Sequence, residues 1–255
     1  MIGNRVTRVE KADESGVVRI RWIPKYTAME RFFHWGHTVT FLALTVTGMI
    51  MFFPFLRPLS QGEGGQLLRL LHRAAAIAYG ALPLIYLILE PRRALLSLKS
   101  VFKVSRDDVE WVKGMVPYYF LGRFEAMAPQ DRFNTGEKLN AVVIILGSVV
   151  FAITGLLMWF GKGILPISVF QAMVVLHDIA MVVTVCMFIV HFYLAVVHPM
   201  MWAGLVSMRF GVTSAAYAQE HHASWYYGAE RAREIYQAKK AALKIKEGSE
   251  ESESR

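Results

Sequence analysis

Four histidines stand within long apolar stretches of the sequence, where polar side chains are costly and usually serve a purpose. They are His34, His72, His177 and His191. His177 and His191 share one stretch and are 14 residues apart, which corresponds to roughly 21 Å along a helix. At about 100° per residue their side chains lie within about 40° of one another. One helix face therefore presents two imidazoles at two different depths.

The other two histidines match those depths on other predicted helices. The helix with His34 enters the membrane from one side and the helix with His72 from the other, so we expect His34 beside His191 and His72 beside His177. Zinc normally takes more than two protein ligands, whereas two imidazoles suit the axial positions of a haem iron. We predict two bis-histidine haem sites that carry electrons. The alternative is hydrogen bonding between helices, and His37 is an alternative ligand.

The elements that position these histidines are apolar stretches of membrane-spanning length, for which about 20 residues suffice. We predict an all-α membrane protein, a bundle of four transmembrane helices that holds two b-type haems. The predicted segments are an N-terminal segment 1–31, a membrane domain 32–209 with helices over 32–56, 66–89, 139–161 and 168–197 and a polar loop over 90–138, and a C-terminal tail 210–255. We expect the tail after Glu220 to be a solvated, partly frayed helix, with docking onto a partner as the alternative.

Composition supports a membrane protein. Of 255 residues 55% are hydrophobic and 19% charged, whereas soluble domains have about 45–50% and about 25%. A simple soluble enzyme, a disordered chain and a nucleic-acid-binding protein are therefore excluded. The single cysteine, Cys186, excludes a disulfide framework and an iron–sulfur cluster held by this chain alone.

The positive charge predicts the orientation of the chain. The net charge is +8, and Lys and Arg gather in three places: seven in residues 1–31, nine in 90–138 and eight from 198 onward. Because cytoplasmic segments carry the excess of basic residues, we expect both termini and the long loop in the cytoplasm. No secretory signal peptide is expected, since the basic residues 1–31 contain no early apolar core.

Four short motifs accompany the histidine pair of the last apolar stretch. They are Arg31–Trp35, Leu70–His72, Phe133–Lys138 and His221–Tyr226. In this order and at these distances, over about residues 25–230, the chain resembles the cytochrome b (gamma) subunit of respiratory membrane-bound formate dehydrogenase. That subunit is part of a wider di-haem cytochrome b family that also serves nickel–iron hydrogenases.

The resemblance implies a function and a cofactor arrangement. His72 and His177 would ligate the outer haem b, and His34 and His191 the inner one. The family takes electrons from a periplasmic catalytic subunit through an iron–sulfur subunit and reduces a quinone, menaquinone or ubiquinone, on the cytoplasmic side. The chain would be a multi-pass protein of the bacterial inner membrane, in a complex that can form higher oligomers, with no substrate-oxidising centre of its own.

The resemblance also implies a quinone pocket of Asn134 and Gly136 beside His191. An amide can donate to a quinone carbonyl, and glycine allows close approach. The alternative for this stretch is an ordinary helix start with Asn134 or Thr135 as its cap. Glu137 stands where the family has Gln, and it would either relay protons or face solvent.

Arg73 and Asp178 directly follow the two proposed outer ligands and are not a family feature that the resemblance explains. We expect either an ion pair between them or Arg73 bound to a haem propionate.

Two other functions remain open. The electron donor could be a nickel–iron hydrogenase or another molybdenum or tungsten oxidoreductase. From a different class, the chain could be a haem-free, proton-coupled helix-bundle transporter that uses intramembrane histidines.

Overall fold

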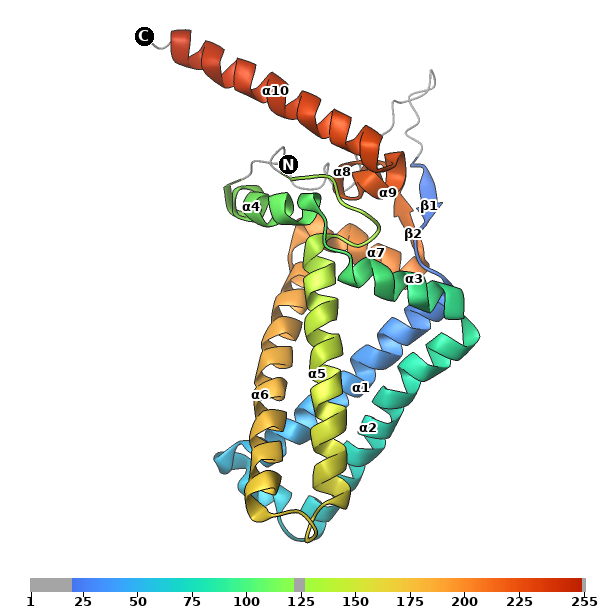
Figure 1. Cartoon of the computed structure of the whole chain (residues 1–255), viewed down its shortest axis with the longest axis vertical. Helices are drawn as coiled ribbons and strands as arrows, with labels where there is room; N and C mark the ends of the chain where they lie inside the picture. The colour runs from blue at the N-terminus through green and yellow to red at the C-terminus, as the bar shows by residue number, and fades with distance from the viewer. Residues whose placement is uncertain (1–19, 122–126, 254–255) are drawn as a thin grey trace.

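The structure is a computed structural model that describes residues 20–121 and 127–253. Four helical segments are long and apolar enough to cross a membrane. They are α1 (Ala28–Phe52), α2 (Gly62–Leu89), α5 (Thr135–Phe160) and α6 (Ile167–Phe192), which continues as a π-helical turn, η3 (Tyr193–Val197) (Figure 1). The prediction of an all-α, four-helix membrane protein is confirmed.

Three of the four spans, α1, α2 and α5, begin four residues earlier than predicted, and polar capping residues start two of them, α1 and α5. Thr27 accepts a hydrogen bond from the backbone N–H of Glu30 at 3.1 Å, and the Glu30 carboxylate accepts one from the Thr27 N–H at 2.8 Å. Asn134 and Glu137 form the same reciprocal pair at the start of α5. The sequence prediction placed both starts at the first charge-free residue and so excluded these caps.

The four spans form two hairpins. The 3₁₀-helix η1 (Pro54–Ser60) connects α1 to α2, and a short turn connects α5 to α6. A Cβ on Gly147 of α5 would lie 2.4 Å from Thr184 Cγ2 of α6, so only glycine permits this helix contact. In Figure 1 the α5–α6 hairpin stands nearly vertical and α1 slants behind it.

The described parts of the segments predicted as a loop and a tail fold, together with residues 22–24 and 199–210, into a cap over one end of the bundle, which we call the terminal cap (Figure 1). The strand β1 (Trp22–Pro24) pairs antiparallel with β2 (Val212–Ser214). The cap helices are α3 (Pro91–Phe102), α4 (Arg106–Leu121), η4 (Pro199–Met201), α7 (Trp202–Phe210), α8 (Ala215–His221), α9 (Ala223–Tyr227) and α10 (Ala229–Glu253). We call the opposite end, with η1 and the α5–α6 turn, the turn end.

The expectation of a solvated, frayed tail after Glu220 was wrong for residues 221–227. Ala215 and Ala218 have no exposed surface, and His222 is 1% exposed. Of the described part of the tail, α10 is the helix that extends away from the bundle, and Arg233 near its start pairs with Asp107 and Glu110 of α4. The apolar alanines and the β1–β2 pairing hold the tail, and neither contact is visible in a composition rich in Ala, Lys and Glu.

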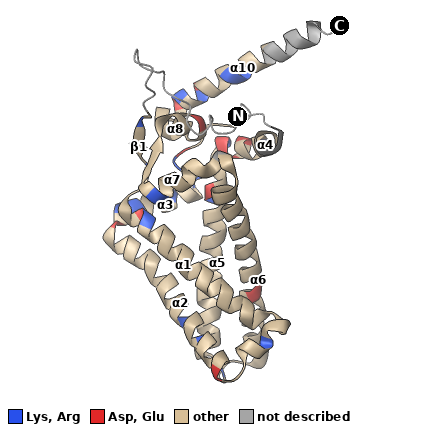
Figure 2. Cartoon of the chain, turned by 180° about the vertical axis from the view of Figure 1, so that it is seen from behind, with Lys and Arg blue, Asp and Glu red and all other residues tan. Residues whose placement is uncertain are grey.

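The charged residues of the described chain gather at the terminal cap and near the turn end, and the middle of the bundle carries almost none (Figure 2). This distribution is what a bilayer requires, because a charge at mid-membrane depth costs several kcal/mol. The bundle therefore exposes an apolar belt to lipid and confines its polar chemistry to the two ends and the interior.

Candidate functional site

The structure brings the four predicted histidines together in the predicted pairs. The ring centres of His72 on α2 and His177 on α6 lie 6.4 Å apart. The ring centres of His34 on α1 and His191 on α6 also lie 6.4 Å apart. The pair on α2 and α6 lies toward the turn end and the pair on α1 and α6 toward the terminal cap, so one helix contributes to both.

The spacing within each pair fits a shared metal better than a direct contact. Two imidazoles that bind one metal at about 2 Å each have ring centres about 6 Å apart. A direct N–H···N hydrogen bond of about 2.9 Å would bring the centres to about 5 Å. In the described part of the chain no hydrogen bond joins the two rings of either pair. A direct hydrogen bond between the two rings of a pair is therefore disfavoured.

Two threonines fix the protonation of the pair near the turn end. Thr47 Oγ1 lies 2.8 Å from His72 Nδ1, and Thr154 Oγ1 lies 2.8 Å from His177 Nδ1. Each hydroxyl also donates to a carbonyl one turn earlier on its own helix, at 2.7 Å. A hydroxyl has one proton, so it must accept from the ring, and Nδ1 carries the hydrogen. Nε2 is then unprotonated on both rings, which is the form that binds a metal.

Sequence reasoning missed Thr47 and Thr154. A threonine in an apolar helix commonly bonds only to its own backbone, and several in this chain do so. No sequence signal separates the two that also meet a histidine from those that do not. The way α1 crosses α2 and α5 crosses α6 decides which threonines meet a histidine.

In the described chain, no threonine hydroxyl bonds to the rings of the pair near the terminal cap. His34 Nδ1 is buried and has no hydrogen-bond partner in the described chain, and an unpaired buried nitrogen is costly. Only a group that reaches this nitrogen would remove that cost. His37, the alternative ligand, stacks on Tyr79 with ring centres 3.9 Å apart, so it is engaged with α2 and belongs to neither pair.

Arg73 lies close to the pair near the turn end. Its guanidinium is 5.0 Å from the ring centre of Trp159 on α5, and within the described residues it forms no ion pair with Asp178. Stacking on an aromatic ring uses the face of the guanidinium and not its N–H donors. Arg73 therefore remains able to bind an anionic group, whereas the expected pairing with Asp178 is not seen.

Asn134 and Gly136, the predicted quinone residues, lie at the start of α5. Asn134 is the N-cap, and its side-chain oxygen accepts from the Glu137 N–H at 2.8 Å. The structure thus shows the helix-start interpretation directly, and the amide nitrogen is left for another partner. A Cβ on Gly136 would lie 3.1 Å from the Trp111 ring, so Trp111 makes the close approach that glycine allows.

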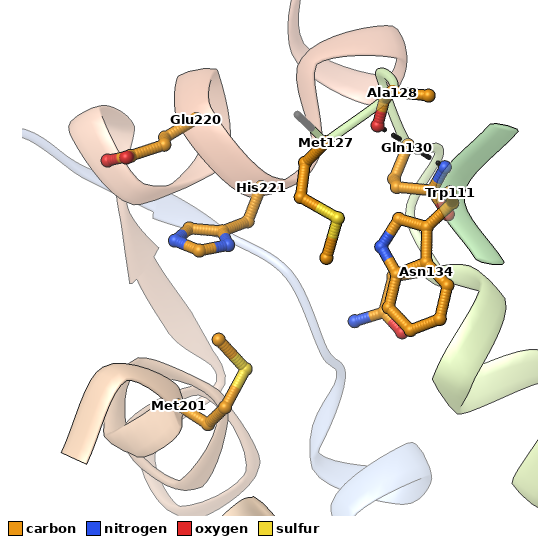
Figure 3. A pocket seen from close by; sticks show the side chains of 8 residues that line it. All are labelled: Trp111, Met127, Ala128, Gln130, Asn134, Met201, Glu220 and His221. Atoms are coloured by element: carbon orange, nitrogen blue, oxygen red, sulfur yellow. Dashed lines mark hydrogen bonds between the residues drawn. The ribbon is translucent and has the colours of Figure 1, made fainter. Parts of the chain in front are cut away.

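Asn134 lines a small cavity that faces the terminal cap, and Figure 3 shows its amide nitrogen pointing into the space beside His221 and Met201. The cavity has a volume of about 10 Å³, which is room for about one water molecule. A quinone ring is much larger, so Trp111 or Met127 must move before a ring can reach Asn134 from this side.

His221 and His222, which the sequence placed in a tail, are core residues of the terminal cap. His221 stacks on Tyr217 with ring centres 4.2 Å apart. His222 Nδ1 lies 2.7 Å from the backbone oxygen of Asp131. Burial lowers the pKa of His221 to about 3 and that of His222 well below its usual range. Both rings are therefore neutral at physiological pH.

The buried His222 predicts that the cap loses stability in acid. In the unfolded chain its pKa returns to about 6.5, so the unfolded chain binds the proton first as the pH falls, and the folded state is disfavoured below pH 6.5. The loss at pH 5 is at most about 2 kcal/mol for this one group. Melting of the detergent-solubilised protein at pH 7.5 and pH 5.0 measures it. His222→Asn, which keeps a donor for the Asp131 carbonyl, should show a smaller acid shift; an identical shift contradicts the prediction.

Comparison with known proteins places the chain among membrane cytochromes. A family model described as prokaryotic cytochrome b561 matches residues 25–211. The cytochrome b556(fdo) subunit of formate dehydrogenase from Escherichia coli K12 is 27% identical over 80% of this chain and 92% of its own. The cytochrome b556 subunit of formate dehydrogenase from Haemophilus influenzae is 25% identical over 87% of each chain. The nitrate-inducible subunit of E. coli K12 is 24% identical over 85% of this chain and 93% of its own.

Proposed function

The chain belongs to the prokaryotic cytochrome b561 family, a family of helical membrane proteins that bind haem, and from this premise we propose that it holds two b-type haems and carries electrons across the membrane to a quinone. In this proposal His72 and His177 hold one haem and His34 and His191 the other. When bound, haem iron supplies one-electron redox chemistry.

One observation carries the proposal: both histidine pairs have the same 6.4 Å spacing, and α6 contributes to both. Thr47 and Thr154 keep Nε2 of His72 and His177 ready to ligate. Arg73 lies at the same end with free donors for a propionate. Two histidines would hold each iron and would leave no position open for a substrate, so the proposed role of the chain is electron transfer.

The relatives suggest the partners and the orientation. They are named as cytochrome subunits of formate dehydrogenase, so we infer that an iron–sulfur subunit and a catalytic subunit of that kind deliver the electrons. The basic terminal cap then lies in the cytoplasm of a bacterial inner membrane, and the turn end meets the partners in the periplasm. The quinone binds between the His34–His191 pair and the start of α5, where Asn134 donates to its carbonyl.

A reduced-minus-oxidised visible spectrum of the purified protein tests the proposal. We expect b-type haem bands and two haems per chain, measured as pyridine haemochrome against protein mass. A colourless protein would support the haem-free transporter. One haem per chain would contradict the assignment of one of the two histidine pairs as a haem site. Copurification of the complex identifies the donor, since a hydrogenase or another oxidoreductase in place of formate dehydrogenase would refute that part.

Thr154→Val should change the potential of one haem and not the other. Valine keeps the shape of threonine but removes the acceptor for His177 Nδ1–H. The ring becomes a weaker electron donor, so the oxidised iron is less stabilised. The potential of one step should rise by about 40 mV, which corresponds to a hydrogen bond of about 1 kcal/mol. A redox titration of the two haem steps measures it.

Thr184→Val is the matched control for this measurement. Thr184 also donates to its own helix carbonyl, at 2.8 Å, but meets no histidine. The potentials of both haem steps should be unchanged in this variant. Equal shifts in the two variants would show that the loss of a hydroxyl from the bundle, and not the bond to His177, moves the potential.

A further inference from the structure

The side chain of Lys25 is buried in the terminal cap although it carries a charged group. It follows β1, and its side chain is 1% exposed. Its backbone N–H donates to the Gly211 carbonyl at 2.8 Å, which fixes the residue beside α7. Buried lysines are rare unless a partner compensates the lost hydration, so the contacts of Lys25 Nζ are informative.

The first partner of Lys25 is a neutral histidine. Lys25 Nζ lies 2.9 Å from His222 Nε2. His222 Nδ1 lies 2.7 Å from the Asp131 carbonyl oxygen, which can only accept. Nδ1 therefore carries the ring hydrogen, Nε2 is unprotonated, and Lys25 is the donor. A neutral acceptor holds the ammonium in place without cancelling its charge.

The second neighbour of Lys25 is the carboxylate of Glu137. Lys25 Nζ lies 3.9 Å from Glu137 Oε1, which is beyond a direct hydrogen bond. The other oxygen of the same carboxylate accepts from the Asn134 N–H at 2.8 Å. Glu137 is 31% exposed, and it lies in the first turn of α5, the helix that Asn134 caps. Glu137 thus connects the buried ammonium to the residues proposed to bind the quinone.

The remaining charged groups around this cluster neutralise one another. Arg132 binds Glu30 of α1 at 2.6 and 2.8 Å and also donates to the backbone oxygen of Lys25 at 2.8 Å. Tyr26 and His221 complete the surroundings. Within the described chain, Glu137 is therefore the carboxylate that faces Lys25, and it does so at a distance that leaves the ammonium incompletely compensated.

The consequence is a lysine that releases its proton readily. Burial lowers the pKa of Lys25, Arg132 lowers it further, and Glu137 opposes both only in part. The matched contrast is Lys138, one turn into α5, whose ammonium binds both oxygens of Asp108 at 2.9 and 3.0 Å. Lys138 is held by a complete ion pair, whereas Lys25 is not.

We propose that Lys25, held by His222, is the proton donor for quinone reduction, and that Glu137 passes the proton on. The proposal rests on the proposed function, which supplies the two electrons. For each of the two protons that form quinol, the 3.9 Å gap between Lys25 and Glu137 first closes by a side-chain movement or is bridged by one water. An N–H bond of Lys25 then breaks and an O–H bond forms on Glu137. That O–H bond then breaks as one forms on the quinone oxygen. A proton from the solvent at the terminal cap restores the ammonium.

Two substitutions of Lys25 separate proton transfer from structure. Lys25→Arg keeps the charge and a donor for His222 but does not release a proton, since the pKa of arginine is above 12. Lys25→Met keeps the length of the apolar side chain and loses both the charge and the hydrogen-bond donor. In membranes that contain the full complex, both variants should keep the haem spectrum and the reduction of haem by the donor. Both should reduce quinone roughly 100-fold more slowly, with haem standing more reduced during turnover.

Glu137→Gln and Lys138→Arg complete the set. Glutamine can form both capping bonds but carries no proton between groups, so Glu137→Gln should slow quinone reduction and leave haem content unchanged. Lys138→Arg keeps its ion pair and should behave as wild type. The pH profile of quinone reduction is the second readout. In wild type the rate should fall as the pH rises past the pKa of Lys25, and in Lys25→Arg this dependence should disappear.

Wild-type rates and an unchanged pH profile in Lys25→Arg would overturn the inference, as would wild-type rates in Glu137→Gln. Slow quinone reduction in Lys25→Met that Lys25→Arg restores would also overturn it, because charge or packing alone would then suffice. Failure of the proposed function has a different signature: the wild-type protein would lack haem or would not reduce quinone, and no comparison between variants would be needed to see it.

Discussion

His191→Ala is expected to abolish quinone reduction while the donor is still oxidised. The side chain of His191 is one half of the pair near the terminal cap, and its removal leaves His34 without a partner at 6.4 Å. A haem with one axial imidazole lost binds weakly, so that site should lose its haem. Quinone reduction should fall to the level of membranes without the complex, and an artificial acceptor should still accept electrons from the donor.

Three measurements check this result on the purified complex: haem content, donor oxidation with an artificial acceptor, and quinol formation. We expect haem to fall from two to one per chain, and the remaining haem to be reduced by the donor but not by added quinol. Normal quinol formation in His191→Ala would refute the assignment of this pair. If the whole complex is lost from the membrane, the substitution has caused a folding defect. His191→Met is then the variant to measure, because methionine offers iron a thioether ligand in place of the imidazole.

His177→Ala is expected to give the opposite pattern. His177 lies at the turn end, where the proposed partners deliver electrons, and it pairs with His72 at 6.4 Å. Its removal should again leave one haem per chain. That haem should be reduced by added quinol but no longer by the donor, and donor-driven quinol formation should be lost.

The two alanine variants control for each other, because both lie on α6 and both remove the same number of atoms. A general loss of packing in α6 would give the same phenotype twice. Opposite responses to the donor and to quinol would show that the two pairs work in series. Reduction by the donor of the haem that remains in His177→Ala would contradict the assignment of the turn end as the entry side.

Much of the fold could be predicted because a bilayer imposes simple rules on a sequence. About 20 apolar residues are needed to span it, and the chain shows this length four times. The helix starts at Thr27 and Asn134 were missed because caps are polar. The terminal cap was missed for a related reason: its contacts join residues far apart in the chain, such as Lys25 with His222.

The sequence by itself determined the four membrane spans and which histidines share a depth, because helix rise and direction are periodic and local. Tertiary structure decided what is near those histidines and how protons are placed on them. Helix crossings set Thr47 and Thr154 against Nδ1 of His72 and His177, and the folded tail buries Lys25 beside Glu137. These contacts depend on how separate helices cross and on how the two ends of the chain meet, and neither is encoded in a local pattern.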